Sequence, residues 1–155
     1  MPDSTPITAA GLEKYQKELA ELKGPRRQEL SARLRAAIQQ GDLSENADYI
    51  QAKEEQGFLE GRIQELEMNL RNVKIIDERP HARTVVDLGA RITVQEDDFP
   101  EETYYLVGSL EANPVGGRIS DESPIGRALM GHRVGDIITV EIPAGNIQLK
   151  ILKIE

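Results

Sequence analysis

The chain contains no cysteine among its 155 residues, so it can form neither a disulfide nor a thiolate metal site. A reducing compartment is the simplest setting for such a sequence. The chain also lacks any apolar run near the ~20 residues that a membrane-spanning helix needs. Its first residues, MPDSTP, have neither the basic nor the apolar region of a targeting signal. We therefore expect a soluble cytoplasmic protein that does not enter a membrane.

Lysine and arginine are in deficit, with 19 of them against 27 acids and a net charge of -8 at pH 7. General nucleic-acid binders carry a surplus of these cations, so that class is excluded. The deficit is uneven, because residues 1–76 have a net charge of -2 and residues 77–155 one of -6. From residue 23 to residue 35, five cations face the single acid Glu29. A local basic stretch thus lies inside an acidic protein.

The first half of the chain predicts two long helices. Apolar residues recur in alternating steps of four and three, the seam of a coiled coil, at Leu12, Tyr15, Leu19 and Leu22 and again at Leu59, Ile63, Leu66, Leu70 and Val73. The first helix should begin near Thr8, a residue that can cap it. Gly24-Pro25 predicts a kink or short break before the seam resumes at Leu30. Gly57 and Gly61 suggest a close approach of the facing helix.

A chain reversal near residues 41–45 makes these two helices antiparallel. Facing positions then have numbers that add to about 87, such as Leu22 with Leu66. At 1.5 Å per residue, arms of roughly 30 residues form a rod about 45 Å long. The reversal, with Asp42 and Glu45, forms the tip of this rod.

The second half of the chain is rich in short β-type runs, and Pro80 ends the helical pattern before them. Turn signals such as Asn113-Pro114 separate the runs, which are residues 91–95, 103–110, 117–120, 137–142 and 148–154. One short helix is predicted for residues 125–130. The whole predicts an α+β protein, with an antiparallel α-helical coiled-coil hairpin in residues 1–76 and a small antiparallel β-sheet domain with one short helix in residues 77–155.

Asp42 and Glu45 admit two interpretations. An acid at the N-cap with a glutamate three residues later matches a capping box, and negative charge suits a helix N-terminus. Residues three apart on a helix also share a face, and carboxylate oxygens are ligands that Mg²⁺ prefers. Two carboxylates in water hold this ion weakly, so a working site needs further ligands from a partner. The tip is consistent with half of a metal site.

Three segments carry longer motifs. Residues 41–49 read GDLSENADY, residues 54–63 read EEQGFLEGRI and residues 123–131 read SPIGRALMG. These segments and their spacing resemble the Gre family of bacterial transcript-cleavage factors, GreA type. The resemblance covers essentially the whole chain and implies a C-terminal domain of FKBP-like topology behind an N-terminal coiled coil.

The same resemblance implies a transcription elongation factor that rescues arrested complexes. The globular domain would dock on the rim of the secondary channel of RNA polymerase, on its largest subunit, while the coiled coil enters the channel. Asp42 and Glu45 would then act in trans at the polymerase active centre, sharing a Mg²⁺ ion that the free protein does not bind tightly. They would stimulate the polymerase's own cleavage of the 3′ end of backtracked RNA. The chain would be a monomeric accessory factor and not an enzyme.

Further residues take roles by resemblance. The basic spot that contacts extruded RNA corresponds to Arg33, Arg35 and Lys53, although a solvated helix face with ordinary ion pairs fits equally well. Asn46 and Tyr49 would support the tip or touch RNA, with packing as the plainer role for Tyr49. Ile50 departs from the family, where histidine is frequent, which argues against proton transfer at that position.

In the C-terminal motif, Ser123 predicts a helix cap with Pro124 at the first helical position. By resemblance alone, the loop of Ser123, Pro124, Ile125 and Gly126 would dock on the polymerase rim. His132 is one of only two histidines, and without cysteine the chain cannot build a zinc site alone.

Two other functions stay open. A peptidyl-prolyl isomerase with a coiled-coil arm would share the domain topology, but its pocket needs several aromatics and the second half offers only Phe99, Tyr104 and Tyr105. A paralogue of the same shape could instead inhibit the polymerase by occluding its channel. The pair Asp42 and Glu45 favours the cleavage factor.

Overall fold

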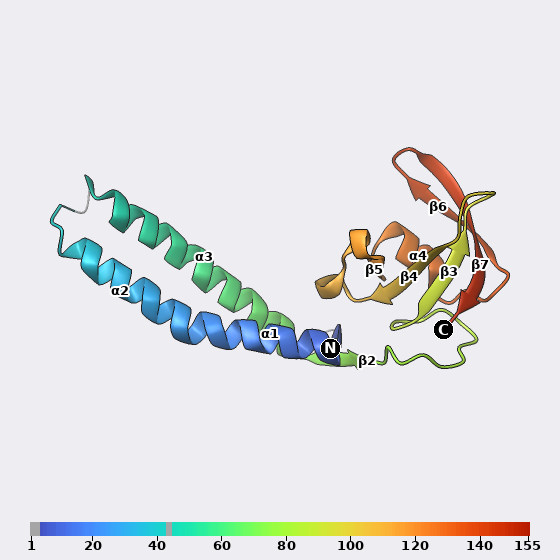
Figure 1. Cartoon of the computed structure of the whole chain (residues 1–155), viewed down its shortest axis with the longest axis horizontal. Helices are drawn as coiled ribbons and strands as arrows, with labels where there is room; N and C mark the ends of the chain where they lie inside the picture. Colours follow the sequence, from blue (N-terminus) through green and yellow to red (C-terminus); the bar gives the residue numbers. More distant parts are fainter. Residues whose placement is uncertain (1–3, 43–44) are drawn as a thin grey trace. The chain divides into compact units, whose positions relative to one another are not determined.

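The computed structural model describes residues 4–42 and 45–155, which form two units (Figure 1). Residues 12–72 make a hairpin unit, and residues 4–11 with 73–155 make a sheet unit. The predicted division after residue 76 is corrected by the two strands β1 (Thr5–Thr8) and β2 (Val73–Ile76), which both belong to the sheet unit. They pair in parallel, with Ile7 opposite Ile75.

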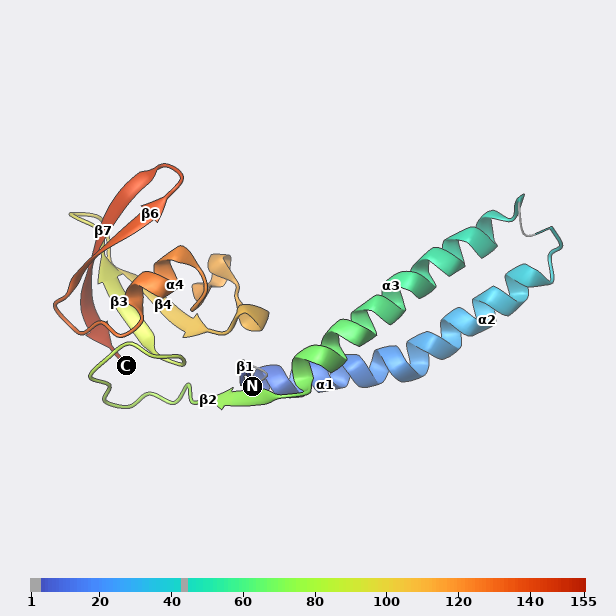
Figure 2. The same ribbon diagram turned by 180° about the vertical axis from the view of Figure 1, so that it is seen from behind.

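The hairpin unit consists of two antiparallel arms that lie side by side (Figures 1 and 2). The first arm runs through α1 (Ala9–Glu21), the π-helical turn η1 (Leu22–Arg26) and α2 (Arg27–Ile38), and the second is α3 (Ala47–Leu70). The apolar seam of the hairpin is buried between the two arms. It comprises Leu30, Leu34, Ala52, Leu59 and Ile63, with Leu19, Leu22 and Tyr49 packed against them. None of the described helices is both long and apolar enough to cross a membrane.

Gly24-Pro25 interrupts the α-helix of the first arm, as predicted, without ending its helical path. The chain passes through this dipeptide in the π-helical turn η1, with Arg26 and Arg27 in ordinary helical conformation. A π turn is wider than an α turn and holds one more residue, so it can accommodate the proline ring and its missing N–H. The same extra residue explains why the buried seam resumes at Leu30, eight residues after Leu22, rather than seven.

The predicted register of the two arms is confirmed by ion pairs that cross between them. Arg27 pairs with Glu60 and Arg33 with Glu55, residue numbers that add to 87 and 88. The idea that glycines let the arms approach closely is wrong, because a Cβ added at Gly57 or Gly61 would meet nothing within 4 Å.

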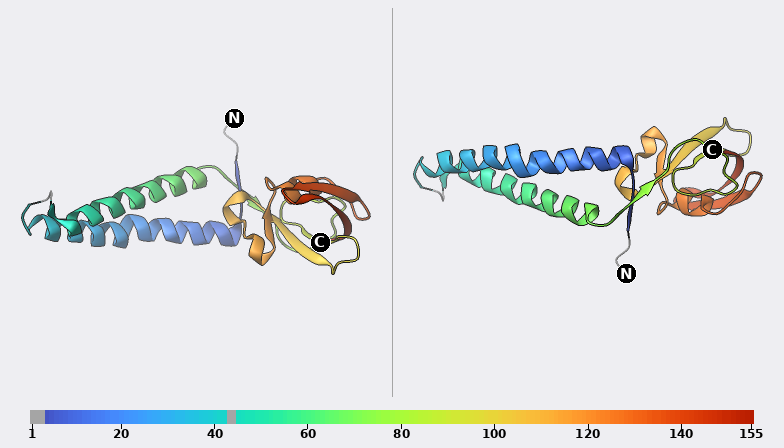
Figure 3. Two further views of the ribbon diagram at one scale, coloured as in Figure 1. Left: turned by 90° about the horizontal axis from the view of Figure 1, so that it is seen from above. Right: turned by 90° about the horizontal axis from the view of Figure 1, so that it is seen from below.

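The sheet unit contains a curled five-stranded sheet of order β5-β4-β3-β7-β6 (Figures 2 and 3). Its strands are β3 (Arg91–Gln95), β4 (Glu102–Val107), β5 (Arg118–Ser120), β6 (Ile137–Ile142) and β7 (Gly145–Ile154). The sequence predicted all five, but the purely antiparallel sheet is wrong, since β4 and β5 run parallel. The chain between them returns through two 3-10 turns, η3 (Ser109–Glu111) and η4 (Pro114–Gly116).

The core of the sheet unit lies between the sheet and the single helix α4 (Pro124–Leu129). Residues 92 and 94 of β3 are buried while their neighbours are not, as expected for a strand with one face on a core. Leu129 of α4 is fully buried in the same cluster. The predicted α+β class is confirmed, and α4 differs from its predicted span by one residue at each end.

Candidate functional site

The hairpin tip carries three carboxylates around one open hollow. Gly41 turns the chain out of α2 with a φ of +118°, a conformation that favours glycine. The hollow has a volume of about 380 Å³, and it is lined by Gln40, Asp42, Glu45, Asn46, Ala47 and Asp48. Leu43 and Ser44 of the predicted tip lie outside the described residues. Asp42, Glu45 and Asp48 are exposed to solvent.

Asn46, and not Asp42, is the N-cap of α3. Its side-chain oxygen accepts a hydrogen bond from the backbone N–H of Tyr49 at 3.1 Å. Its side-chain nitrogen donates to the carbonyl oxygen of Ala37, in the last turn of α2, at 2.6 Å. One amide therefore caps the second arm and ties it to the first. The capping-box interpretation of Asp42 and Glu45 is wrong, because α3 begins at Ala47.

Asp48 is a third acid that the sequence interpretation missed. It lies in the first turn of α3, where a negative charge suits the helix dipole. A signal was present, because Asp42, Glu45 and Asp48 recur every three residues. Hard carboxylate oxygens are suitable donors for Mg²⁺. Yet no three acids or histidines within residues 4–42 and 45–155 are grouped closely enough to hold a metal ion. The carboxylate oxygens are thus of the type that Mg²⁺ prefers, but the described residues do not bring enough of them together to hold the ion alone.

The predicted basic spot is divided by the structure. Arg33 forms an ion pair with Glu55 of α3, and Lys53 donates to the side chain of Gln56 at 3.2 Å. Arg35 is exposed, and its side chain makes no hydrogen bond or ion pair with any other described residue. The wider basic stretch is largely matched by acids of α3, through the pairs Lys23–Glu67 and Arg27–Glu60. Tyr49 is half-buried and packs against the seam, as its plainer role predicts.

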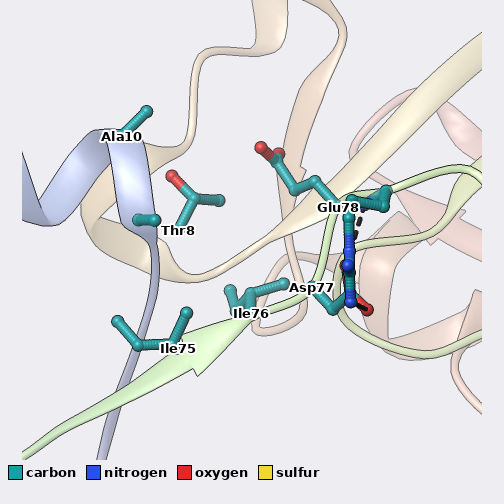
Figure 4. Close-up of a pocket in the computed structure, with 8 residues that line it drawn as sticks. Thr8, Ala10, Ile75, Ile76, Asp77 and Glu78 are labelled. Atoms are coloured by element: carbon teal, nitrogen blue, oxygen red, sulfur yellow. Dashed lines mark hydrogen bonds and ion pairs between the residues drawn. The ribbon is translucent and has the colours of Figure 1, made fainter.

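The sheet unit has an open hollow of about 550 Å³ beside β1 and β2 (Figure 4). Thr8, Ala10, Ile75 and Ile76 form its apolar side, and Asp77 lies at its edge. The polar groups there already have partners, because Asp77 binds Arg79 and Glu78 binds Arg118. Hydrogen bonding from Arg79 lowers the pKa of Asp77 to about 2. This hollow offers no uncommitted charged group for chemistry.

Family comparisons match both halves of the chain. Residues 5–75 match "Transcription elongation factor, N-terminal", and residues 80–155 match "Transcription elongation factor, GreA/GreB, C-term". The chain belongs to the GreA/GreB family. The resemblance seen in its motifs is thereby confirmed.

Members of the GreA/GreB family align with almost the whole chain. Transcription elongation factor GreA of Thermoanaerobacter pseudethanolicus is 48% identical over 149 residues, which are 96% of this chain and 95% of that protein. The GreA of Lactococcus lactis is 44% identical over 156 residues and covers 100% of both chains. Among solved structures, GreA factor homolog 1 of Thermus thermophilus is 28% identical, covers 99% of both chains and has a TM-score of 0.45.

The C-terminal motif of this GreA/GreB member has a clear structural role. Ser123 is the N-cap of α4, accepting from the N–H of Gly126 at 3.1 Å, and its hydroxyl donates to the carbonyl oxygen of Ser120. A Cβ on Gly126 would lie 1.9 Å from that same carbonyl oxygen, so only glycine fits. Ile125 packs against the core, while Pro124 at the first helical position is exposed. The predicted cap is confirmed, and docking through this loop stays a prediction.

Proposed function

We propose that this protein stimulates the intrinsic RNA-cleavage activity of RNA polymerase in backtracked transcription complexes. The hairpin tip enters the secondary channel and brings Asp42 and Glu45 to the active centre, where they act in trans. The protein is an accessory factor and not itself an enzyme, it works as a monomer in the cytoplasm, and it releases the 3′ end of the RNA as a short fragment.

The observation that carries this proposal is the placement of the acids around the tip hollow. Asn46 supplies the helix cap and the tie to α2, so capping does not account for Asp42 and Glu45. An exposed cluster of like charges repels itself and gains from a cation. Asp48 lines the same hollow and adds to its negative charge. Membership of the GreA/GreB family supports the choice of transcription as the setting.

Asp42 and Glu45 would hold a Mg²⁺ ion only together with ligands from the polymerase, because no complete metal cluster occurs among the described residues of this chain. When bound, such an ion supplies activation of a water molecule and stabilises the charge that develops on the phosphodiester. The protein's own contribution is to deliver two carboxylates on an arm whose end is fixed by the Asn46 side chain. Arg35 and Lys53 would lie beside the RNA, as exposed cations near the same end of the arm.

The sheet unit then serves to dock on the rim of the channel, on the largest subunit of the polymerase. Within the family motif, Pro124 is exposed and could contact the rim directly. Ser123 and Gly126 instead shape the loop, through the cap and the close approach to Ser120. Substitutions at these two positions would therefore act on docking through the fold of the loop.

An isomerase function has less support. Tyr104 and Tyr105 are neighbours on β4 and so point to opposite faces of the sheet. The Tyr104 hydroxyl donates to Glu102, and the Tyr105 ring lies 4.9 Å from the Arg91 guanidinium. Phe99 is 61% exposed at a loop. The three aromatics therefore do not form the shared apolar pocket that such an enzyme needs.

The test is to add the protein to stalled, backtracked transcription complexes and to look for short 3′ RNA fragments. We expect Asp42→Asn with Glu45→Gln to reduce the cleavage rate by roughly 10–100-fold, as loss of metal-supporting groups does elsewhere. Polymerase binding by this variant should be retained. The matched control is Glu54→Gln, an exposed acid of α3 that does not line the hollow.

Cleavage at the normal rate by the double variant would contradict the role of the two acids. Inhibition of RNA synthesis without any cleavage by the natural protein would favour the channel-blocking alternative. Isothermal calorimetry of the protein alone with Mg²⁺ gives an independent check, because tight stoichiometric binding would contradict a shared, incomplete site.

A further inference from the structure

The turn between β3 and β4 places an exposed phenyl ring inside a dense run of acids. Phe99 is 61% exposed. Five of the seven residues from 96 to 102 are acids, namely Glu96, Asp97, Asp98, Glu101 and Glu102. No lysine or arginine occurs anywhere from residue 92 to residue 117. This turn thus combines a large apolar group with a strong field of one sign, a pairing typical of a recognition surface.

The backbone that carries the exposed ring is held in place by hydrogen bonds on both sides of Phe99. The N–H of Phe99 donates to the carbonyl oxygen of Glu96 at 2.9 Å. The Phe99 carbonyl oxygen accepts from the Gln95 side chain at 3.0 Å. Asp97 adopts a left-handed conformation with a φ of 47°, which tightens the turn. The turn is therefore preformed, so a partner that binds it has little ordering entropy to overcome.

Beside the ring lies a small hollow of about 180 Å³. It is lined by Val94, Glu96, Phe99, Pro100, Glu102 and Leu149. Val94 and Leu149 are almost fully buried and form its apolar part, while Glu96 and Glu102 add carboxylates. Sites for drug-sized molecules usually measure about 300–1,000 Å³, so this hollow suits a single side chain of a larger partner.

The acids of the turn have no cationic partner of their own. Across residues 4–42 and 45–155, none of the five forms an ion pair. Lys150 pairs with Gln95 in the β3–β7 ladder, yet it makes no ion pair with them. Partial burial, a hydrogen bond to Glu102 and the charges of Glu102 and Glu96 raise the pKa of Tyr104 to about 12. The negative field at the hollow is thus locally uncompensated.

We propose that this turn is a docking site for a basic segment of a partner protein, which inserts one arginine or lysine side chain into the hollow. The stem of that side chain packs on the apolar wall, and its cationic head lies between the carboxylates of Glu96 and Glu102. The ring of Phe99 adds a cation–π contact. Nucleic acid is repelled by the same field. The site is independent of Asp42 and Glu45, so it goes beyond the proposed role in RNA cleavage.

The experiment uses the full-length protein and a short fluorescent peptide of alternating arginine and glycine, with a glutamate–glycine peptide as the negative control. Binding is followed by anisotropy at about 0.1 M salt, where long-range attraction is screened beyond ~10 Å. Backbone amide NMR locates the peptide. We expect shift changes confined to residues 94–104 and the neighbouring part of β7, and no binding of the acidic peptide.

Matched variants separate a built site from general negative charge. Glu96→Gln with Glu102→Gln removes the two carboxylates that line the hollow, and should weaken binding roughly ten-fold. Asp98→Asn with Glu101→Gln removes the same charge from the same turn but outside the hollow, and should weaken it less than about two-fold. Phe99→Ala should cost roughly two- to five-fold.

Equal losses in the two double variants would overturn the proposal, and so would shift changes centred on the acids of the hairpin tip. Thermal unfolding of each variant shows whether the sheet unit remains folded. If Glu96→Gln with Glu102→Gln unfolds the unit, the loss of peptide binding by Phe99→Ala is compared with the loss by Asp98→Asn with Glu101→Gln. A larger loss for Phe99→Ala supports the proposal, and an equal or smaller loss overturns it. Failure of the peptide to bind the natural protein would also end the proposal, whatever the outcome of the RNA-cleavage test.

Discussion

Arg27 and Glu60 are joined across the hairpin by two hydrogen bonds, 2.8 Å from Nε and 2.7 Å from Nη2 of one guanidinium to the two oxygens of the carboxylate. This fork geometry is directional, so it holds α2 and α3 at one register. Both side chains are well exposed, at 40% and 43%, which limits what the pair adds to stability. The pair therefore selects an alignment that the buried seam stabilises.

Acid unfolding tests this pair. Hydrogen bonding from Arg27 holds the pKa of Glu60 below its ordinary value of 4.5. The contribution of the Glu60 carboxylate to stability is then fully present above the pKa that Glu60 has in the unfolded state. It is lost as the pH falls through the lower pKa that Glu60 has in the folded state. We expect Glu60→Gln to flatten the decline of the free energy of unfolding below about pH 4.5. Urea titrations at several pH values measure this, with Glu54→Gln as the control, and parallel curves for Glu60→Gln and the natural protein would contradict it.

Substitutions at Asn46 separate its two hydrogen bonds. Asn46→Ala removes both the cap and the tie to Ala37, and should lower the stability of the hairpin by about 1 kcal/mol or more. Asn46→Asp keeps an oxygen for the Tyr49 N–H but cannot donate to the Ala37 carbonyl. We expect the stability order natural protein, Asn46→Asp, Asn46→Ala in thermal unfolding. If Asn46→Asp and Asn46→Ala were equally unstable, the cap would have no role.

The same change, glycine to alanine, should have opposite effects in the two units. At Gly61 of α3 an added Cβ meets nothing within 4 Å, so Gly61→Ala should raise stability by about 0.5–1 kcal/mol. At Gly126 the Cβ would collide with the Ser120 carbonyl oxygen, and such overpacking costs about 1–3 kcal/mol or more. Denaturant unfolding of both variants checks the signs. Stabilisation by Gly126→Ala would show that α4 can shift away from Ser120.

Ile7 and Ile75 face each other in the β1–β2 ladder with opposite exposure. Ile7 is 0% exposed and Ile75 is 52% exposed. Ile7→Ala should therefore destabilise the sheet unit by about 2–5 kcal/mol, and Ile75→Ala should remain within about 0.5 kcal/mol of the natural protein. Hydrogen exchange at core amides of β3 and β7 reports the change. Equal effects would mean that β1 is not part of that unit.

Local patterns predicted most elements of the fold. The spacing of Leu59, Ile63 and Leu66 predicted α3, and the short β-type run of residues 91–95 predicted β3, because each pattern lies within a single element. Strands β1 and β2 escaped prediction because each has only four residues and finds its partner far away in the sequence. The parallel pairing of β4 with β5 likewise depends on the path of the connecting turns.

The candidate site was only partly predictable for a similar reason. Asp42 and Glu45 stand out in the sequence, and their spacing fits a capping box, but a cap belongs to the residue at which the helix begins. That residue is Asn46, whose choice also depends on the Ala37 carbonyl of the other arm. Likewise, the sequence shows Arg33 only as one cation of a basic stretch. Its ion pair with Glu55 becomes visible only once the antiparallel register of the two arms is known.

The π-helical turn at residues 22–26 stores one surplus residue in the first arm. The apolar residues of α1 and those of α2 both face α3. Along the sequence, however, the two sets are offset by one position from a single regular repeat. The turn therefore absorbs the extra residue without changing which side of α1 or α2 faces α3. Deletion of Pro25 would convert the turn into ordinary α-helix and leave the apolar residues of both helices directed at α3. Deletion of one residue within α2 would instead rotate the rest of that helix by about 100° and turn its cations away from the acids of α3.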